Sequence, residues 1–571
     1  MKSKKERIIL GLCNLCFFLV MLKELCTGIF PDEEYQIVMS YRLAAGDGLF
    51  HYSWDTIQTS GFINYILIKA YTLVHDTQGL VLFLRTCGML IQCGVYFVLL
   101  KTLERHMSKI QAGIVGTVML LTVPKLILSP DFSNMQQWFS VLMLCALWKA
   151  YDGSVENDKL SKVMLVLAAL CNCGIILSQA CFVIIPIEML ALCLLFPKKK
   201  WKSNLWFWGT CAVTGILYFL MILINNGWNV TMTGIRGILA GDMTHASGAN
   251  IVGQSVLISL IKNGAQLGMA MAAAFLIAFA FVFCKCKVQK LPFRWRAVGI
   301  LALLVSCVYT LYLWLIKGYG YDAMKLYIPV SMCLALVILG VKAKKKEALR
   351  DYLLPFVGML VNLGIFVNVL FISNVPMINN LSFLSTSVVW SLVILCLSVK
   401  EEREEKIWNA VALGTVLLTV CVATGFTLPS SPSGNNILSC RQRICCGPAR
   451  SIFTAERTAK VYSTAAHEFA ENIQEGSKVL LVSNSFDNTL VNYCYLMKDV
   501  EISHYSVNST PTYSMKLEEY WNLYPEKYPD VIAVNKNTYT TWEWDWILLY
   551  VRDYYGYKEV VNTESFDFYY R

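Results

Sequence analysis

Acidic side chains stand at two places where the chain leaves an apolar segment. Asp32 and Glu33 follow the first apolar run, within residues 31–35, and Asp131 lies in residues 129–133, between two later runs. A carboxylate beside hydrocarbon is costly and therefore needs a reason. It can accept a proton from an incoming hydroxyl or amine, or it can bind a divalent cation. We expect Asp32 and Asp131 to converge on one outer cavity. The alternative is that both are solvated interfacial residues or helix N-caps.

Two basic residues occupy similar boundary positions. Arg85 lies near the outer end of the second apolar run, and Lys325 lies between the ninth and tenth runs. A cation at this level can bind the phosphate of a lipid. It can also simply extend its side chain towards the headgroups, and the sequence leaves both interpretations open.

The composition places these residues in a membrane protein. Of 571 residues, 56% are hydrophobic and only 15% are charged, and the mean hydropathy is +0.51. Soluble globular chains carry about 25% charged residues. This composition excludes an ordinary soluble protein, a disordered chain and a fibrous repeat. The net charge of +10 would suggest nucleic acid as a partner only if the basic residues were clustered on one accessible face.

Apolar runs long enough to cross a bilayer as helices recur along the first three quarters of the chain. They predict about thirteen spans, at residues 8–28, 80–100, 110–128, 134–150, 162–178, 180–196, 204–224, 264–284, 297–316, 325–341, 353–373, 382–399 and 407–427.

The distribution of Lys and Arg predicts the orientation of these spans. With a cytoplasmic N-terminus, the inner loops hold 27 basic residues, whereas the rest of the chain before residue 430 holds nine. An excess of Lys and Arg marks cytoplasmic loops. We therefore expect a multi-pass protein of the cell membrane, with its C-terminal region outside. The positive charge then sets orientation, and no nucleic-acid partner is expected.

The chain divides into two parts at about residue 428. Residues 1–427 form the membrane domain, whose first outer loop, 29–79, should hold a helix at 35–45 and a second at 62–74, lying on the membrane surface. Residues 428–571 predict an extracytoplasmic α/β domain, because helical and β-rich runs alternate. The expected elements are a helix at 454–475, strands at 478–482, 500–505, 531–534, 559–561 and 566–570, and a Trp-rich helix at 541–554.

These outer residues, taken in order, resemble the GT-C glycosyltransferases. The similarity is greatest to the branch that contains the protein O-mannosyltransferases and the aminoarabinose transferases, and it covers most of residues 1–200. The chain has the Asp-Glu pair at Asp32-Glu33, a helix ending at Gly46-Asp47, and a span opening with Leu84-Arg85 followed by Gly88. It also has a second acidic loop at Asp131 and a loose match to a later basic motif from Lys325 to Pro329.

The resemblance implies transfer of a sugar from a polyprenyl-phosphate donor to a glycan, lipid or protein acceptor on the outer face of the membrane. It implies Asp32 as general base, Asp131 as a positioning group or metal support, and Glu33 as a weaker candidate for orienting the base. Arg85 and Lys325 would neutralise the leaving phosphate. Direct displacement would invert the anomeric configuration.

Two departures from the family leave the cofactor open. Residues 58–61 read Gln-Thr-Ser-Gly where the aminoarabinose branch has Glu-Lys-Pro-Pro, which removes a proposed metal ligand and a basic phosphate contact. Lys325 stands where the family has arginine. A divalent cation is therefore possible but is not required.

Two other classes of function compete with the enzyme. A lipid-linked-sugar transporter or flippase would predict internal repeats and broken spans at matching positions, and neither is visible. A non-catalytic cell-envelope assembly protein would use the outer domain to bind partners.

Overall fold

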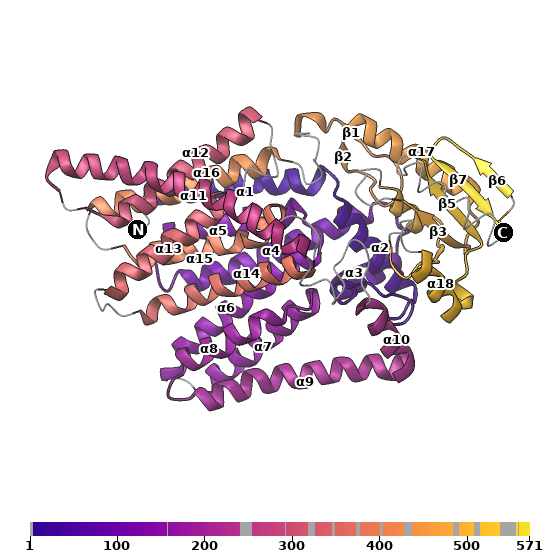
Figure 1. Cartoon of the computed structure of the whole chain (residues 1–571), viewed down its shortest axis with the longest axis horizontal. Coiled ribbons are helices and arrows are strands. Elements are labelled where there is room, and N and C mark those ends of the chain that lie inside the picture. Colours follow the sequence, from indigo (N-terminus) through magenta and orange to yellow (C-terminus); the bar gives the residue numbers. More distant parts are fainter. Residues whose placement is uncertain are drawn as a thin grey trace.

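The computed structural model describes the whole chain except residues 1–3, 157, 240–253, 292, 318–325, 345–348, 373–376, 400–402, 428–436, 484–489, 508–513, 537–555 and 558. A helical bundle occupies one end of the molecule and a mixed sheet with its helices the other, and α2 and α3 lie between them (Figure 1). The chain is thus a polytopic helical protein with a C-terminal α/β domain.

Each predicted span corresponds to one helix of the bundle. The helices are α1 (Lys4–Cys26), α4 (Leu80–Leu103), α5 (Lys109–Leu121), α6 (Phe132–Glu156), α7 (Asp158–Ser178), α8 (Ile185–Leu195), α9 (Lys200–Asn226), α11 (Gln254–Gln289), α12 (Trp295–Lys317), α13 (Tyr327–Lys344), α14 (Arg350–Ile372), α15 (Ser385–Leu397) and α16 (Arg403–Phe426).

Nine helices among the described residues are long and apolar enough to cross a membrane, and α5 and the segment Phe182–Leu195 are shorter apolar helices. The chain is therefore a multi-pass membrane protein.

Two 3-10 turns precede helices of the bundle: η3 (Phe182–Ile184) lies before α8, and η5 (Met377–Leu384) lies before α15. The amphipathic helix α10 (Trp228–Leu239) follows α9.

One predicted span is wrong at its C-terminal end. The span at 110–128 ends as a helix at Leu121, and the chain then continues through the 3-10 turn η2 (Pro124–Leu126). Pro124 explains the break, because proline disfavours helical backbone in the residue before it and donates no hydrogen bond. Non-helical backbone at this depth must find internal partners. The Asn134 and Gln137 side chains of α6 supply them by donating to the carbonyls of Thr122, Ile127 and Ser129.

Residues 29–79 hold the helices expected there. Helix α2 (Pro31–Ala45) begins four residues earlier than predicted, with proline in its first turn and three acidic residues after it, a favourable helix N-terminus. The turn η1 (Gln58–Gly61) and helix α3 (Phe62–Thr72) follow.

The C-terminal domain is built on a five-stranded sheet in the order β4-β3-β5-β7-β6. Strands β4 (Glu501–Ile502), β3 (Lys478–Val482) and β5 (Val531–Asn535) are parallel, and β7 (Phe566–Tyr570) and β6 (Glu559–Asn562) continue the sheet antiparallel. The remaining elements are α17 (Glu456–Asn472), α18 (Ser514–Leu523), the β1 (Gln442–Arg443)–β2 (Phe453–Thr454) ribbon, and the turns η6 (Ile437–Ser439), η7 (Val491–Leu496) and η9 (Pro525–Lys527).

The strand predictions are confirmed in position, although β4 covers only Glu501–Ile502 of residues 500–505. Residues 541–554 lie outside the described residues.

Residues 29–79 and the C-terminal domain share one hydrophobic core. Ile37 and Val38 of α2 and Leu84 of α4 pack in one cluster with Phe469 and Phe568 of the domain. Burial of apolar surface is the main favourable term in such packing. The domain therefore packs on the acidic helix α2 together with the first turns of the membrane helix α4.

Candidate functional site at the membrane boundary

Asp32 forms an ion pair with a lysine that the sequence interpretation did not single out, Lys125, and the charge of this lysine also acts on Asp131. The Lys125 ammonium contacts Asp32 Oδ2 at 2.5 Å, and its side chain is only 7% exposed. Asp32 itself is 40% exposed. Its second oxygen, Oδ1, makes no hydrogen bond or ion pair with any residue that the structure describes. We call Asp32, Lys125 and Asp131 the boundary cluster.

Asp131 is the buried member of this cluster. It caps α6, because its Oδ1 accepts from the Asn134 backbone N–H at 2.7 Å, and both of its oxygens lie within 2.8 Å of the Ser133 hydroxyl. The N-cap alternative is thus correct for this residue. Burial raises the pKa of Asp131 to about 6. The Lys125 charge and the two hydrogen bonds oppose that shift, whereas the Asp32 charge adds to it, so both charges of the cluster act on this carboxyl.

A glycine of α4 lets the Lys125 loop approach. A Cβ added at Gly88 would collide with the Leu128 carbonyl oxygen and approach Pro130 Cδ within 3.3 Å. The Asn64 side chain of α3 donates to the Pro130 carbonyl at 2.6 Å from another direction. The loop that carries Lys125 and Asp131 is therefore fixed by α3, α4 and α6 together. The signal that could have identified it was Pro124 within an apolar run.

Glu33 and Arg85 form a separate buried pair. Arg85 Nε and Nη2 donate to the Glu33 carboxylate at 2.8 and 2.6 Å, and both side chains are 1% exposed. The guanidinium also donates to the carbonyls of Thr27 and Gly28 at the end of α1. The structure does not bring this pair into the boundary cluster. Lys325 lies outside the described residues.

The third acidic residue of α2, Glu34, faces the C-terminal domain. It accepts from the Tyr493 backbone N–H at 3.2 Å, and its side chain is buried. Burial raises the pKa of Glu34 to about 7, and hydrogen bonds from Tyr493 and Asn492 oppose the shift. The three acidic residues of one helical turn therefore point to three different environments.

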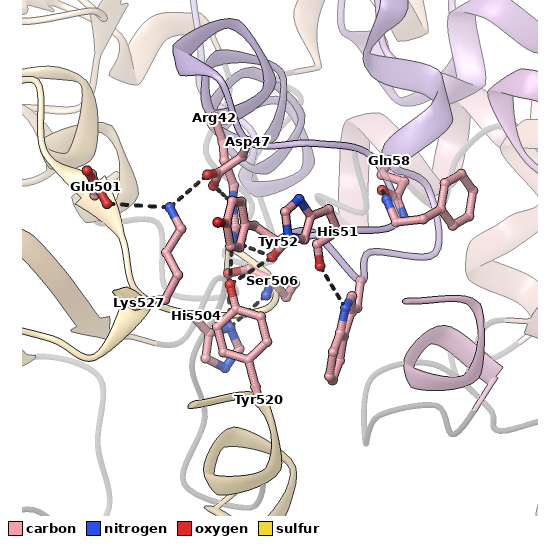
Figure 2. Close-up of polar contacts among 12 residues, drawn as sticks. Arg42, Asp47, His51, Tyr52, Gln58, Glu501, His504, Ser506, Tyr520 and Lys527 are labelled. Carbon is pink, nitrogen blue, oxygen red and sulfur yellow. Dashed lines mark hydrogen bonds and ion pairs between the residues drawn. The ribbon is translucent and has the colours of Figure 1, made fainter. Parts of the chain in front are cut away.

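A second charged group joins α2 to the domain (Figure 2). Asp47 accepts from Arg42, and Lys527 contacts its other oxygen at 2.7 Å. Arg42 also donates to the Tyr52 carbonyl at 2.5 Å and to the Tyr520 hydroxyl at 3.2 Å. We call Arg42, Asp47, Tyr52, Tyr520 and Lys527 the interface cluster. In the sequence, Gly46-Asp47 was identified only as part of the family pattern. The contacts of Asp47 with Arg42 and Lys527 show that it holds the C-terminal domain against the end of α2.

Neither cluster offers a ready metal centre. Within the part of the chain that the structure describes, no group of three or more His, Cys, Asp or Glu side chains could hold a metal ion. Gln58 of η1 uses its side-chain oxygen to accept from the Phe50 backbone N–H at 2.9 Å.

The fold and site define a multi-pass membrane protein with the boundary cluster of two aspartates and a lysine where the helical bundle meets α2. Neither a protein-family model nor a curated protein matches the chain. Among solved structures, the apo structure of ArnT from Cupriavidus metallidurans is similar, with a TM-score of 0.44 and 11% identity over 98% of this chain and 97% of its own.

Two structures of the Archaeoglobus fulgidus oligosaccharyltransferase are also similar. The apo form has a TM-score of 0.43 and 11% identity, over 94% of this chain and 70% of its own. The form tethered to an acceptor peptide with the NVT sequon has 0.42 and 10%, over 94% and 69%. ArnT and the oligosaccharyltransferase are GT-C superfamily members, the superfamily that the sequence resembles.

Proposed function

We propose that the chain is a membrane glycosyltransferase that moves a sugar from a polyprenyl-phosphate donor to a glycan, lipid or protein acceptor at the outer face. The orientation follows from the basic residues of the loops, with the N-terminus in the cytoplasm and the C-terminal domain outside. The observation that carries the proposal is Asp32: a half-exposed carboxylate at the membrane boundary, with one oxygen held by a lysine and the other without a partner among the described residues.

Asp32 is the general base of this proposal. Its Oδ1 takes the proton of the acceptor hydroxyl or amine, and the acceptor atom attacks the anomeric carbon. The bond from that carbon to the phosphate oxygen breaks, and its electron pair leaves with the polyprenyl phosphate. The new bond forms on the opposite face of the sugar, so the configuration inverts. Asp131 positions the acceptor side of the site.

The basic residues receive different roles in this proposal. Lys325 neutralises the leaving phosphate, as the resemblance implies. The contacts of Arg85 support a positioning role instead, because its guanidinium is engaged by Glu33 and the carbonyls that end α1. Glu33 then fixes the first turn of α2, and Asp32 with it.

The test is transfer by purified full-length protein in lipid nanodiscs, with a labelled polyprenyl-phosphate sugar and candidate acceptors. Asp32→Asn keeps the size of the side chain and removes the base, so we expect transfer to fall about 10²- to 10⁴-fold. Asp76→Asn, an exposed carboxylate of the same loop, is the matched control and should keep wild-type activity.

Full activity of a folded Asp32→Asn protein would refute the assignment of the base. Movement of labelled donor across the bilayer without transfer would favour the flippase alternative.

A further inference from the structure

Lys125 is an unusual lysine for a membrane boundary. Its backbone has a φ of 56°, in the left-handed region that non-glycine residues rarely adopt. Its ammonium lies 3.9 Å from the Phe132 ring centroid and 5.4 Å from that of Phe383. A lysine that extends to the headgroups carries its charge outwards. This one carries its charge inwards, onto Asp32 and two aromatic rings.

The burial of this ammonium requires compensation. A charge taken from water without a partner is strongly unfavourable, and it is tolerated when it is paired. Asp32 provides the pair, and Phe132 and Phe383 provide ring faces that attract a cation. Asp131 lies close enough for the Lys125 charge to act on it. The loop thus places one fixed positive charge in contact with Asp32 and near enough to Asp131 to act on its carboxyl.

A divalent cation does not fit this arrangement. Such an ion needs several oxygen ligands, usually from two or more carboxylates, around a central position. Here Asp32 Oδ2 is engaged by the Lys125 ammonium, and both Asp131 oxygens accept hydrogen bonds. An added ion would also be repelled by the adjacent ammonium. Gln58, which stands in the stretch that departs from the Glu-Lys-Pro-Pro pattern, brings no carboxylate.

We propose that the Lys125 ammonium takes the place of a divalent cation between Asp32 and Asp131, so that the reaction proceeds without a metal. Lys125 is a positioning residue in this scheme. It fixes one of the Asp32 oxygens by an ion pair, which leaves Oδ1 to face the acceptor. This inference rests on the proposed function for its role in transfer, but its claim about the cation position can be tested without any activity.

The first experiment measures Mn²⁺ binding to purified full-length protein by electron paramagnetic resonance. Wild type should show no Mn²⁺ site that depends on Asp32. Lys125→Ala opens the space between the carboxylates and should gain one such site, which Asp32→Asn added to it should remove. Lys125→Gln, which keeps most of the side-chain volume, provides a second test should the alanine variant unfold. Lys69→Ala removes an exposed boundary lysine and should gain none.

Two results would overturn the proposal. One is Mn²⁺ binding by wild type that Asp32→Asn abolishes. The other is a folded Lys125→Ala or Lys125→Gln protein that binds no more Mn²⁺ than wild type.

The second experiment uses transfer activity and a chelator. Wild-type transfer should be unchanged within about twofold after EDTA treatment, and Lys125→Gln should lose about 10²-fold or more, as removal of a fixed charge from a reacting site does. Loss of wild-type activity in EDTA with recovery on added Mg²⁺ or Mn²⁺ would overturn the metal-free scheme and leave the glycosyltransferase intact. Absence of transfer from every protein would refute the proposed function, whereas the Mn²⁺ measurement would still decide the cation position.

Discussion

The boundary cluster and the interface cluster contain the same pair of residue types, an aspartate and a lysine, but the two aspartates differ in how fully they are paired and buried. In both, an aspartate contacts a buried lysine. In the interface cluster the Asp47 carboxylate has a cation on each oxygen, from Arg42 and Lys527, and is 11% exposed. In the boundary cluster the Asp32 carboxylate has a cation on one oxygen only and is 40% exposed.

A carboxylate with both oxygens paired holds two elements together, whereas one with an oxygen in reserve can take a proton. The location of the two clusters agrees with this difference. The interface cluster joins α2 to the C-terminal domain (Figure 2), and the boundary cluster lies at the other end of α2, beside the membrane helices. One helix therefore connects the interface cluster at one end to the boundary cluster at the other, where we propose the reaction.

The largest effect on stability should come from removing the charge of Asp47. Asp47→Asn leaves the buried Arg42 without its carboxylate and Lys527 with only Glu501, 3.6 Å away, and breaking a buried ion pair in this way costs about 3–5 kcal/mol. We expect a clearly lower melting temperature of the purified protein. Asp499→Asn is the matched control, since Asp499 accepts a hydrogen bond from Tyr41 on the exposed edge of the same interface. A similar melting temperature for the two variants would break the comparison.

Arg85→Lys tests whether the buried pair with Glu33 positions the reactive end of α2. An ammonium cannot reproduce the paired contact with the carboxylate and the contact with the Gly28 carbonyl at once. We expect kcat of transfer to fall about 10- to 100-fold, since small displacements of reacting groups have effects of this size. KM for the donor should stay within about twofold. A raised KM with unchanged kcat would instead support the phosphate-binding role.

The pH dependence of transfer should report Asp131. Because burial raises its pKa to about 6, the carboxyl becomes protonated as the pH falls through about 6, and transfer should decline there. Lys125→Gln removes a charge that lowers this pKa, so the acid limb should move to higher pH. Glu34→Gln is the control, because Glu34 faces the domain and its removal should leave the limb in place. The same limb in wild type and Lys125→Gln would contradict the coupling.

The membrane helices and the sheet could be predicted from sequence because each has its own periodic pattern. Among the described residues, every predicted apolar run contains a helix and nine helices are long and apolar enough to cross a membrane, and β3 and β7 were predicted with the bounds that the structure has. The boundary carboxylates were identified because charge is scarce in this chain.

Lys125 was not identified, because its loop is apolar enough to extend a predicted span. Its inward direction depends on the break at Pro124 and on two contacts that fix the loop. These are the close approach of Leu128 to Gly88 and the hydrogen bonds from Asn134. The roles of Glu33 and Arg85 also depend on a pairing between residues 52 positions apart, which no local pattern contains.

The smallest expected effects come from removing the side-chain hydroxyl of either of two tyrosines in the interface cluster, Tyr520 and Tyr52. Tyr520 is buried, and its hydroxyl accepts from Arg42 and donates to the Tyr52 carbonyl at 3.0 Å. The Tyr52 hydroxyl donates to Glu526 at 2.9 Å on the exposed side. Tyr520→Phe should cost about 1–3 kcal/mol, because a buried partner of a charged group is left unsatisfied. Tyr52→Phe should cost at most about 0.5 kcal/mol, because water replaces the lost hydroxyl.

Both variants are measured as shifts in melting temperature against wild type. Equal shifts would mean that water reaches the whole interface cluster. The interface cluster would then not be the fully paired, buried counterpart of the boundary cluster.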